Sequence, residues 1–151
     1  MAHQADPLEP ARVEHGEQVV GQRLLVIVAG QGYVGLPLAM RAVEAGHRVV
    51  GYDVDARRIA RLAEADSYVE DIPAARVRAA LDSGRYLPTA DAADLAEFDI
   101  AVITVPTPLR DGIPDLRYIE SCAQTLAAHL RPGATVVLES TTYPGTTEEL
   151  M

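Results

Sequence analysis

The chain has 151 residues, of which 48% are hydrophobic, which is enough for one globular domain with a substantial core. Its formal net charge of −9 argues against nucleic acid or an anionic membrane surface as the main partner. The single cysteine, Cys122, excludes a disulfide within the chain and a metal site built from several cysteines.

Residues 1–22 are polar and acidic, and they lack the basic start and apolar stretch of a secretory signal. We predict that they form a leader and that the domain occupies residues 23–151. No apolar run approaches the ~20 residues of a membrane span, and the four histidines lack the spacing of metal ligands. We therefore expect a soluble, cytoplasmic protein with no metal.

Apolar runs and amphipathic segments alternate along the rest of the chain. The continuous apolar run Leu24–Ala29 is typical of a strand buried on both faces of a parallel sheet. Further strands are predicted at 47–52, 86–89, 99–105 and 135–138, of which the last two are also expected to be buried. Helices are predicted at 34–45, 56–65, 73–82 and 116–130, with Asp115 as the N-cap of the last. Asp111-Gly112 is interpreted as a turn.

This order of elements predicts an α/β fold, with a doubly wound parallel sheet and right-handed crossovers. It is the arrangement of Rossmann-type dinucleotide-binding domains, which usually have six strands. We count five strands here, so the sheet is expected to be truncated after the fifth.

Three glycines spaced G-x-G-x-x-G lie between the first strand and the first helix, at Gly30, Gly32 and Gly35. In this context the first glycine permits a tight turn, the second lets a pyrophosphate approach the backbone, and the third lets the helix lie close to the strand. The free N–H groups from Tyr33 and Val34 onward then face the phosphates. The alternative is a plain tight turn, but the flanking strand and helix favour a dinucleotide.

An acidic residue is expected about 20 positions further on, at the end of the second strand. Asp53 occupies that position, where its carboxylate would accept hydrogen bonds from the adenosine ribose and repel a 2′-phosphate. This favours NAD over NADP. Asp55 lies past the strand and is a weaker candidate, and Arg58 is either a contact on the adenine side or an exposed helix residue.

Two further loops are expected at the same edge of the sheet, where ligands bind in open α/β folds. The loop after the fourth strand contains Thr107 between two prolines. The loop at 139–147 carries a hydroxyl on six of its nine residues. Such loops are often only turns and helix caps, but their position favours a role at the cofactor. Cys122 is predicted to be a small buried thiol within a helix.

Four segments together resemble the UDP-glucose/GDP-mannose dehydrogenases over residues 23–151. GQGYVGLPLA resembles the glycine motif of that family, VPTPL and PDLRYIE its middle motif, and ESTTYPGTTEE its third. SYVEDIP, at 67–73, resembles a segment of members that act on UDP-glucose and UDP-N-acetylhexosamines. Enzymes of this family oxidise the C6 hydroxyl of a nucleotide sugar twice, through a cysteine thiohemiacetal and thioester, with two NAD.

The resemblance implies NAD as the cofactor, a UDP-sugar substrate and a homo-oligomer. It also implies site residues: the pyrophosphate is held at Gly30, Gly32, Tyr33, Val34 and Gly35, the adenosine end by Asp53 and Arg58, and the rest of the cofactor near Thr107 and Thr141. By the same resemblance, Thr141 lies close to the nicotinamide and supports catalysis.

The family's nucleophilic cysteine and its lysine belong to a C-terminal domain. Cys122 does not match the catalytic cysteine motif, and all 13 basic residues are arginine. We therefore expect this chain to be the cofactor half of a UDP-sugar 6-dehydrogenase, inactive alone. A stand-alone NAD-sensing module and another hydroxyl-oxidising dehydrogenase remain alternatives, and the identity of the sugar stays open.

Overall fold

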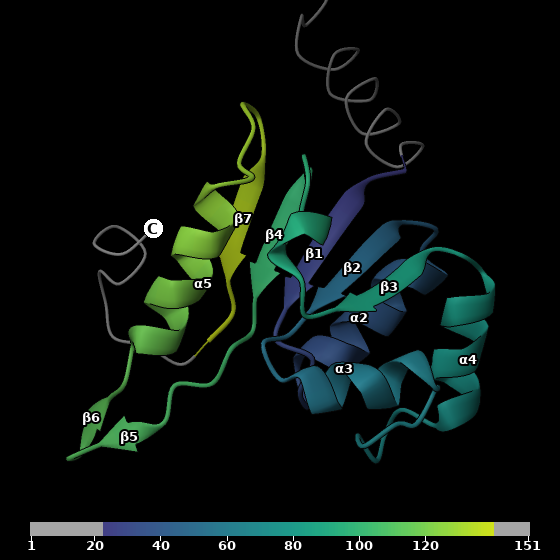
Figure 1. The fold of residues 1–151 in the computed structure, drawn as a ribbon, viewed down its shortest axis with the longest axis horizontal. Helices are drawn as coiled ribbons and strands as arrows, with labels where there is room; N and C mark the ends of the chain where they lie inside the picture. Colours follow the sequence, from purple (N-terminus) through teal and green to yellow (C-terminus); the bar gives the residue numbers. More distant parts are fainter. Residues whose placement is uncertain (1–22, 141–151) are drawn as a thin grey trace, which may run out of the picture.

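The computed structural model describes residues 23–140 of the chain. Five parallel strands form its main sheet, in the order β3-β2-β1-β4-β7 (Figure 1). These strands are β1 (Leu25–Ala29), β2 (Arg48–Tyr52), β3 (Tyr86–Thr89), β4 (Ile100–Ile103) and β7 (Thr135–Leu138). The five strands of the doubly wound parallel sheet are those predicted from the sequence.

Helices connect the strands and cover both faces of the sheet (Figure 1). They are α2 (Gly35–Glu44), α3 (Ala56–Ala63), α4 (Ala74–Asp82) and α5 (Arg117–Ala127), with a short 3-10 helix, η1, at Ala92–Asp94. Successive side chains of a strand point to opposite faces, so β1 contributes to two cores. Val26 and Val28 pack with α2, α3 and α4, whereas Ile27 and Ala29 pack with Phe98 and α5.

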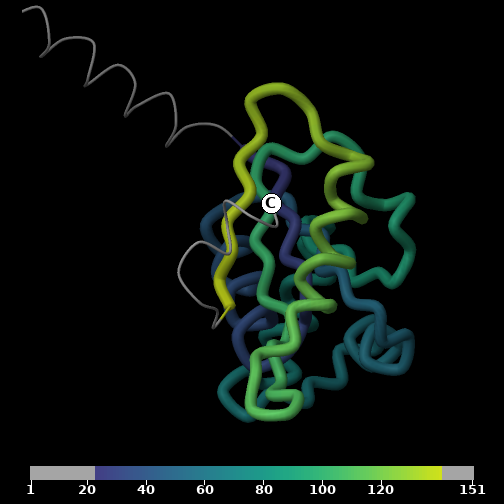
Figure 2. The backbone as a smooth tube through the Cα atoms, turned by 90° about the vertical axis from the view of Figure 1, so that its left-hand side faces the viewer, coloured from purple at the N-terminus to yellow at the C-terminus, as the bar shows by residue number. Residues whose placement is uncertain are grey.

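The order of the strands places a crevice at the end of β1. The chain passes from β1 to β2 on one side and later returns to β4 on the other side. Loops that leave the carboxyl ends of β1 and β4 therefore diverge, which leaves space for a ligand between them. Figure 2, turned by 90° from Figure 1, shows α5 running alongside β4 and β7 on one side of this sheet.

The region from 109 to 116 differs from the sequence prediction. Asp111 and Gly112 do form a turn, both with positive φ, but they join a small antiparallel hairpin of β5 (Leu109–Arg110) and β6 (Ile113–Pro114). Asp115 is not the N-cap of α5, because Leu116 holds that position. The Asp115 carboxylate instead accepts the backbone N–H of Arg117 at 3.2 Å and pairs with its guanidinium, which lowers the pKa of Asp115 to about 2.

The prediction that the last strand, β7, is buried is also wrong. β7 lies at one end of the sheet order, and its side chains are alternately exposed and half-buried, with Val137 41% exposed. A strand with a neighbour on one side only leaves much of its surface open to solvent. The predicted leader at 1–22 and most of the hydroxyl-rich loop lie outside the described residues.

Candidate functional site

The turn between β1 and α2 has two glycines that the packing requires and one that it does not. A Cβ on Gly35 would lie 1.6 Å from the carbonyl oxygen of Gly30, and a Cβ on Gly30 would lie 2.8 Å from the carbonyl oxygen of Thr104. Gly30 also has a φ of +95°, which side chains disfavour. By contrast, the nearest atom to a Cβ on Gly32 would be Nη1 of Arg58, at 3.8 Å. Gly32 therefore borders open space.

The amino end of α2 opens onto that space. Its N-cap, Val34, offers no side-chain hydrogen bond, and the first turn contains no acidic residue. The first N–H groups of a helix have no partners within the helix and carry a partial positive charge. Tyr33 and Val34 are 77% and 54% exposed, so the backbone that leads into the helix is accessible. The end of α2 thus suits an anionic group.

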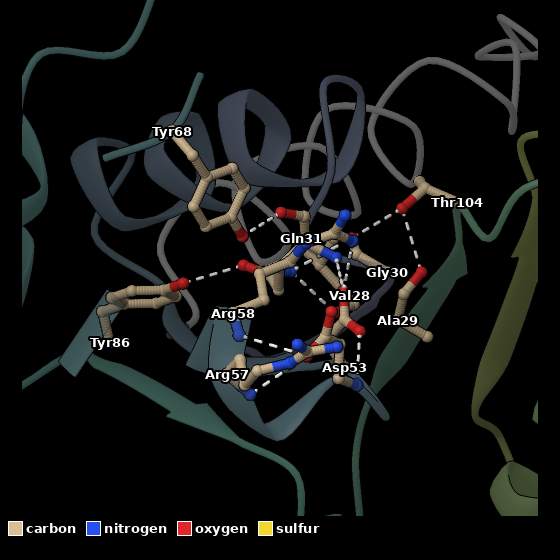
Figure 3. Close-up of polar contacts among 11 residues, drawn as sticks. Val28, Ala29, Gly30, Gln31, Asp53, Arg57, Arg58, Tyr68, Tyr86 and Thr104 are labelled. Carbon is tan, nitrogen blue, oxygen red and sulfur yellow. Dashed lines mark hydrogen bonds and ion pairs between the residues drawn. The ribbon is translucent and has the colours of Figure 1, made fainter. Parts of the chain in front are cut away.

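The middle residue of the turn, Gln31, is fully buried and makes side-chain contacts on both sides (Figure 3). Its Nε2 donates to the carbonyl of Val28 at 2.9 Å, and its Oε1 accepts from the hydroxyl of Tyr86 at 2.7 Å. Gly51 on β2 makes room for this amide, since a Cβ there would lie 2.5 Å from Oε1. No local sequence pattern marks Gln31, because its partner Tyr86 lies 55 positions away.

Asp53 directly follows β2 beside the turn and is 7% exposed. Its Oδ2 accepts the backbone N–H of Gln31 at 2.9 Å and Nη1 of Arg58 at 3.0 Å, and its Oδ1 accepts the N–H of Asp55 at 2.9 Å. A carboxylate has about four acceptor positions, so this one retains a free position on Oδ1. Partial burial alone would lower the pKa of Arg58, but the hydrogen bond and charge of Asp53, together with Tyr68 and Asp55, raise it above its ordinary value.

Asp55, the weaker sequence candidate, has a structural role. It is the N-cap of α3 and accepts the N–H groups of Arg57 and Arg58 at 3.0 and 3.4 Å. Through this cap and its own N–H bond to Asp53, it fixes the start of α3 against the end of β2. The Arg58 side chain consequently starts close to the Asp53 carboxylate.

Thr104, directly after β4, contacts the turn from the opposite side, and no sequence motif marks it. Its hydroxyl lies 2.9 Å from the carbonyl oxygens of both Ala29 and Gly30. Its backbone N–H donates to Ala29 at 2.8 Å, which continues the pairing of β1 with β4. Figure 3 shows Thr104 reaching the turn from the side opposite Tyr68 and Tyr86. Residues of β1 and β3 and the residue after β4 therefore hold one short segment.

The turn borders a cleft of about 770 Å³, within the size range of small-molecule sites. Its lining contains these sequence candidates: Gly30, Gly32, Tyr33, Val34, Asp53 and Arg58. Gly35 is buried and does not line the cleft. The opposite wall belongs to α5 and includes Ser121, Cys122 and Thr125.

Thr107 does not line this cleft but a neighbouring one of about 630 Å³, which shares Val34 and residues 104–106 with it. Glu139 and Ser140 form its far side. The Ser140 hydroxyl donates to the carbonyl of Val105 at 3.0 Å, so the loops after β4 and β7 contact each other. Thr141 lies outside the described residues.

A family model covers nearly the whole described domain. Residues 24–151 match the NAD binding domain of the UDP-glucose/GDP-mannose dehydrogenase family. The chain belongs to this family. The part that matches is the NAD-binding domain, so the cofactor of this chain is NAD.

Relatives and solved structures agree with the family assignment. The chain is 38% identical over 129 residues to UDP-N-acetyl-D-glucosamine 6-dehydrogenase of Pseudomonas aeruginosa, covering 83% of this chain and 29% of the relative. The structure of UDP-D-ManNAc dehydrogenase from Pyrococcus horikoshii matches with a TM-score of 0.81 and 35% identity, covering 84% of this chain and 31% of that one. A UDP-glucose dehydrogenase from Pyrobaculum islandicum gives 0.78 and 37%, covering 85% and 31%.

These matches cover only part of the other proteins. The chain spans about 30% of the length of the curated relatives that it matches.

Between residues 23 and 140, no helix is long and apolar enough to cross a membrane. The same described residues contain no group of three or more His, Cys, Asp or Glu side chains that could hold a metal ion.

Cys122 lines the cleft, but its thiol is expected to be a poor nucleophile at neutral pH. Its side chain is 6% exposed, and burial raises the pKa of its thiol to about 12. Only a thiolate is a strong nucleophile. The thiol therefore stays protonated throughout the neutral range, and Cys122 contributes apolar surface to the wall formed by α5.

We predict that Cys122 in the folded chain reacts with iodoacetamide at pH 8 roughly a thousandfold more slowly than an unperturbed cysteine thiol. The rate should rise with pH up to a pKa of about 12. Mass spectrometry measures the labelling, and the same chain in urea provides the control with an ordinary rate. Rapid labelling of the folded chain at pH 8 would contradict this assignment.

Proposed function

We propose that this chain is the NAD-binding part of a UDP-sugar 6-dehydrogenase, which oxidises the C6 hydroxyl of the sugar to a carboxylate. The oxidation consumes one water and two NAD and yields two NADH. The main support is a single arrangement: an uncapped helix end, an open glycine and a buried carboxylate border one cleft in a member of this family. The relatives named above act on three different UDP-sugars, and we propose the UDP-sugars as the substrate class.

The residues of the main cleft fit NAD. Gly32, Tyr33 and Val34 would receive the pyrophosphate, because the backbone there is accessible and lies at the positive end of α2. Gly30 and Gly35 support that contact by shaping the turn. Asp53, with its free acceptor position, would bind the adenosine ribose. Arg58, which lines the cleft beside it, would border the adenosine end.

The neighbouring cleft suits the reactive end of the cofactor. It continues from the main cleft past Val34 and Thr104 and is lined by Thr107 and Ser140. NAD supplies a hydride acceptor at its nicotinamide. We propose that Thr107 lies near that ring, and that Thr141, the residue after Ser140, supports catalysis there. These hydroxyls would orient groups by hydrogen bonding, since neither is expected to ionise.

The first test concerns the choice between NAD and NADP. Asp53→Asn should weaken NAD binding about tenfold, because an uncharged amide accepts ribose hydrogen bonds less strongly than a carboxylate. The change also releases Arg58, which can then pair with a 2′-phosphate, so the preference for NAD over NADP should narrow. Calorimetry measures both affinities. Asp55→Asn is the matched control, since asparagine also caps helices and Asp55 does not line the cleft. Equal affinities for NAD and NADP in the unaltered chain would contradict the assignment of Asp53 as the residue that selects NAD.

The second test separates the two kinds of glycine. Gly32→Val should abolish NAD binding and leave the fold intact, because the new side chain enters the open cleft. Gly35→Val should disrupt the fold, since its Cβ would overlap the carbonyl of Gly30. Circular dichroism and calorimetry measure the two properties. A native spectrum together with unchanged NAD binding in Gly32→Val would mean that the turn has only a structural role.

The third test concerns the reaction. We expect the 151-residue chain to bind NAD but to form no NADH with UDP-N-acetylglucosamine, UDP-N-acetylmannosamine or UDP-glucose. The second oxidation would lack its covalent intermediate, because the only cysteine has a thiol pKa of about 12 and cannot serve as a thiolate nucleophile at neutral pH. The first oxidation would lack the sugar-binding part, which under this proposal belongs to the family's C-terminal domain. The protein encoded by the complete reading frame should form two NADH per molecule of one of these sugars. The absorbance of NADH measures this yield. If that protein binds NAD and oxidises none of them, the chain serves another purpose, such as NAD sensing. Turnover by the short chain that is lost in Cys122→Ser would overturn our assignment of that residue.

A further inference from the structure

Tyr68 lies in the segment between α3 and α4 and reaches back to the glycine-rich turn. Its hydroxyl donates a hydrogen bond to the backbone carbonyl of Gln31 (Figure 3). Its ring faces two guanidinium groups of α3: the Cζ atoms of Arg58 and Arg61 lie 5.3 and 5.2 Å from the ring centroid. Both distances are within the range of cation–π attraction. Burial raises the pKa of Tyr68, so its hydroxyl remains a donor.

Arg58 is consequently held from two directions. The Tyr68 ring lies on one side, and the Asp53 carboxylate accepts its Nη1 at 3.0 Å on the other. An unrestrained arginine side chain samples many rotamers and loses that freedom when it binds a ligand. Two existing contacts restrict the side chain before a ligand arrives. Restriction of this kind increases affinity because less freedom is lost on binding.

The restrained guanidinium faces the cofactor cleft. Arg58 lines the cleft together with Asp53 and Gly32, and its Nη1 is the nearest atom to the empty Cβ position of Gly32. Its charge is therefore beside both the ribose acceptor and the accessible backbone of the turn. Tyr68 itself does not line the cleft. Any effect of Tyr68 on a ligand must pass through a residue that it holds.

We propose that Tyr68 is a positioning residue for NAD, which keeps the guanidinium of Arg58 at the adenosine end of the cleft. The proposal rests on the assignment of this cleft to NAD, and it gives one residue of the segment at 67–73 a role in cofactor affinity. The ring provides the effect through Arg58, whereas the hydroxyl fixes the ring to the turn.

Arg61 provides a matched control on the same ring. It stacks on Tyr68 as Arg58 does, but its guanidinium is bound to the exposed Asp66, at 2.7 and 3.3 Å, and it does not line the cleft. If Tyr68 acted only through general stability of this region, loss of Arg61, which contacts the same ring, would also weaken NAD binding. If it acts through Arg58, loss of Arg61 leaves NAD binding unchanged, and loss of Tyr68 has no effect once Arg58 is absent.

The test measures NAD affinity by calorimetry in single and double variants of the 151-residue chain. Tyr68→Leu should weaken binding roughly threefold to tenfold, the magnitude of one cation–π contact. Tyr68→Phe, which keeps the ring, should retain most of the affinity. In an Arg58→Gln background, Tyr68→Leu should have no further effect. Arg61→Gln should leave the affinity unchanged, and thermal unfolding of each variant reports its stability separately.

A measurement without ligand completes the test. The ring should shift the Nε–H proton resonance of Arg58 in NMR spectra, and this shift should persist in Tyr68→Phe and vanish in Tyr68→Leu. Equal losses of affinity from Tyr68→Leu with and without Arg58 would overturn the proposal, as would unchanged affinity in Tyr68→Leu or no NAD binding by the unaltered chain. No UDP-sugar enters these measurements, so a failure of the proposed oxidation would not be mistaken for a failure here.

Discussion

Backbone from the ends of β1 and β4 and from the start of α2 meets at one point, where the hydroxyl of Thr104 joins the two strand ends. The carbonyl of Gly30 occupies the space that a side chain of Gly35 would need, and the carbonyl of Thr104 occupies the space beside Gly30. This contact brings the amino end of α2 to the carboxyl edge of the sheet. The other features of the cleft depend on this contact, because it fixes the turn against which Asp53 and Arg58 are positioned.

The local charges of the cleft differ from the charge of the whole chain. A net charge of −9 would be expected to repel a dinucleotide that carries two phosphates. In the cleft, however, the helix end has no acidic side chain in its first turn, and Asp53 is paired with Arg58. Charges across the surface are screened over about 10 Å at ordinary salt, so these close groups dominate the field that a ligand meets.

The sequence was sufficient to predict the sheet, the glycine turn and Asp53, because each depends on patterns within a short stretch of chain. Gly30, Gly32 and Asp53 could be located by spacing alone. Gln31, Tyr68 and Thr104 could not, since their roles arise from partners that lie far away in the sequence. Gln31, for example, meets Tyr86 across 55 positions, and Thr104 meets Ala29 across 75. Pattern analysis does not register contacts of this kind.

The amide of Gln31 has a consequence for how this turn can vary between related sequences. It occupies the space above Gly51, where a Cβ would lie 2.5 Å from Oε1 and 2.8 Å from the ring of Tyr86. A sequence that acquires a side chain at position 51 must therefore replace Gln31 or move the ring at position 86. These three positions, one in the turn after β1 and one each on β2 and β3, are expected to change together during evolution. Alignments of close relatives should show this as covariation between the glycine-rich turn and the next two strands, separate from any covariation imposed by the cofactor.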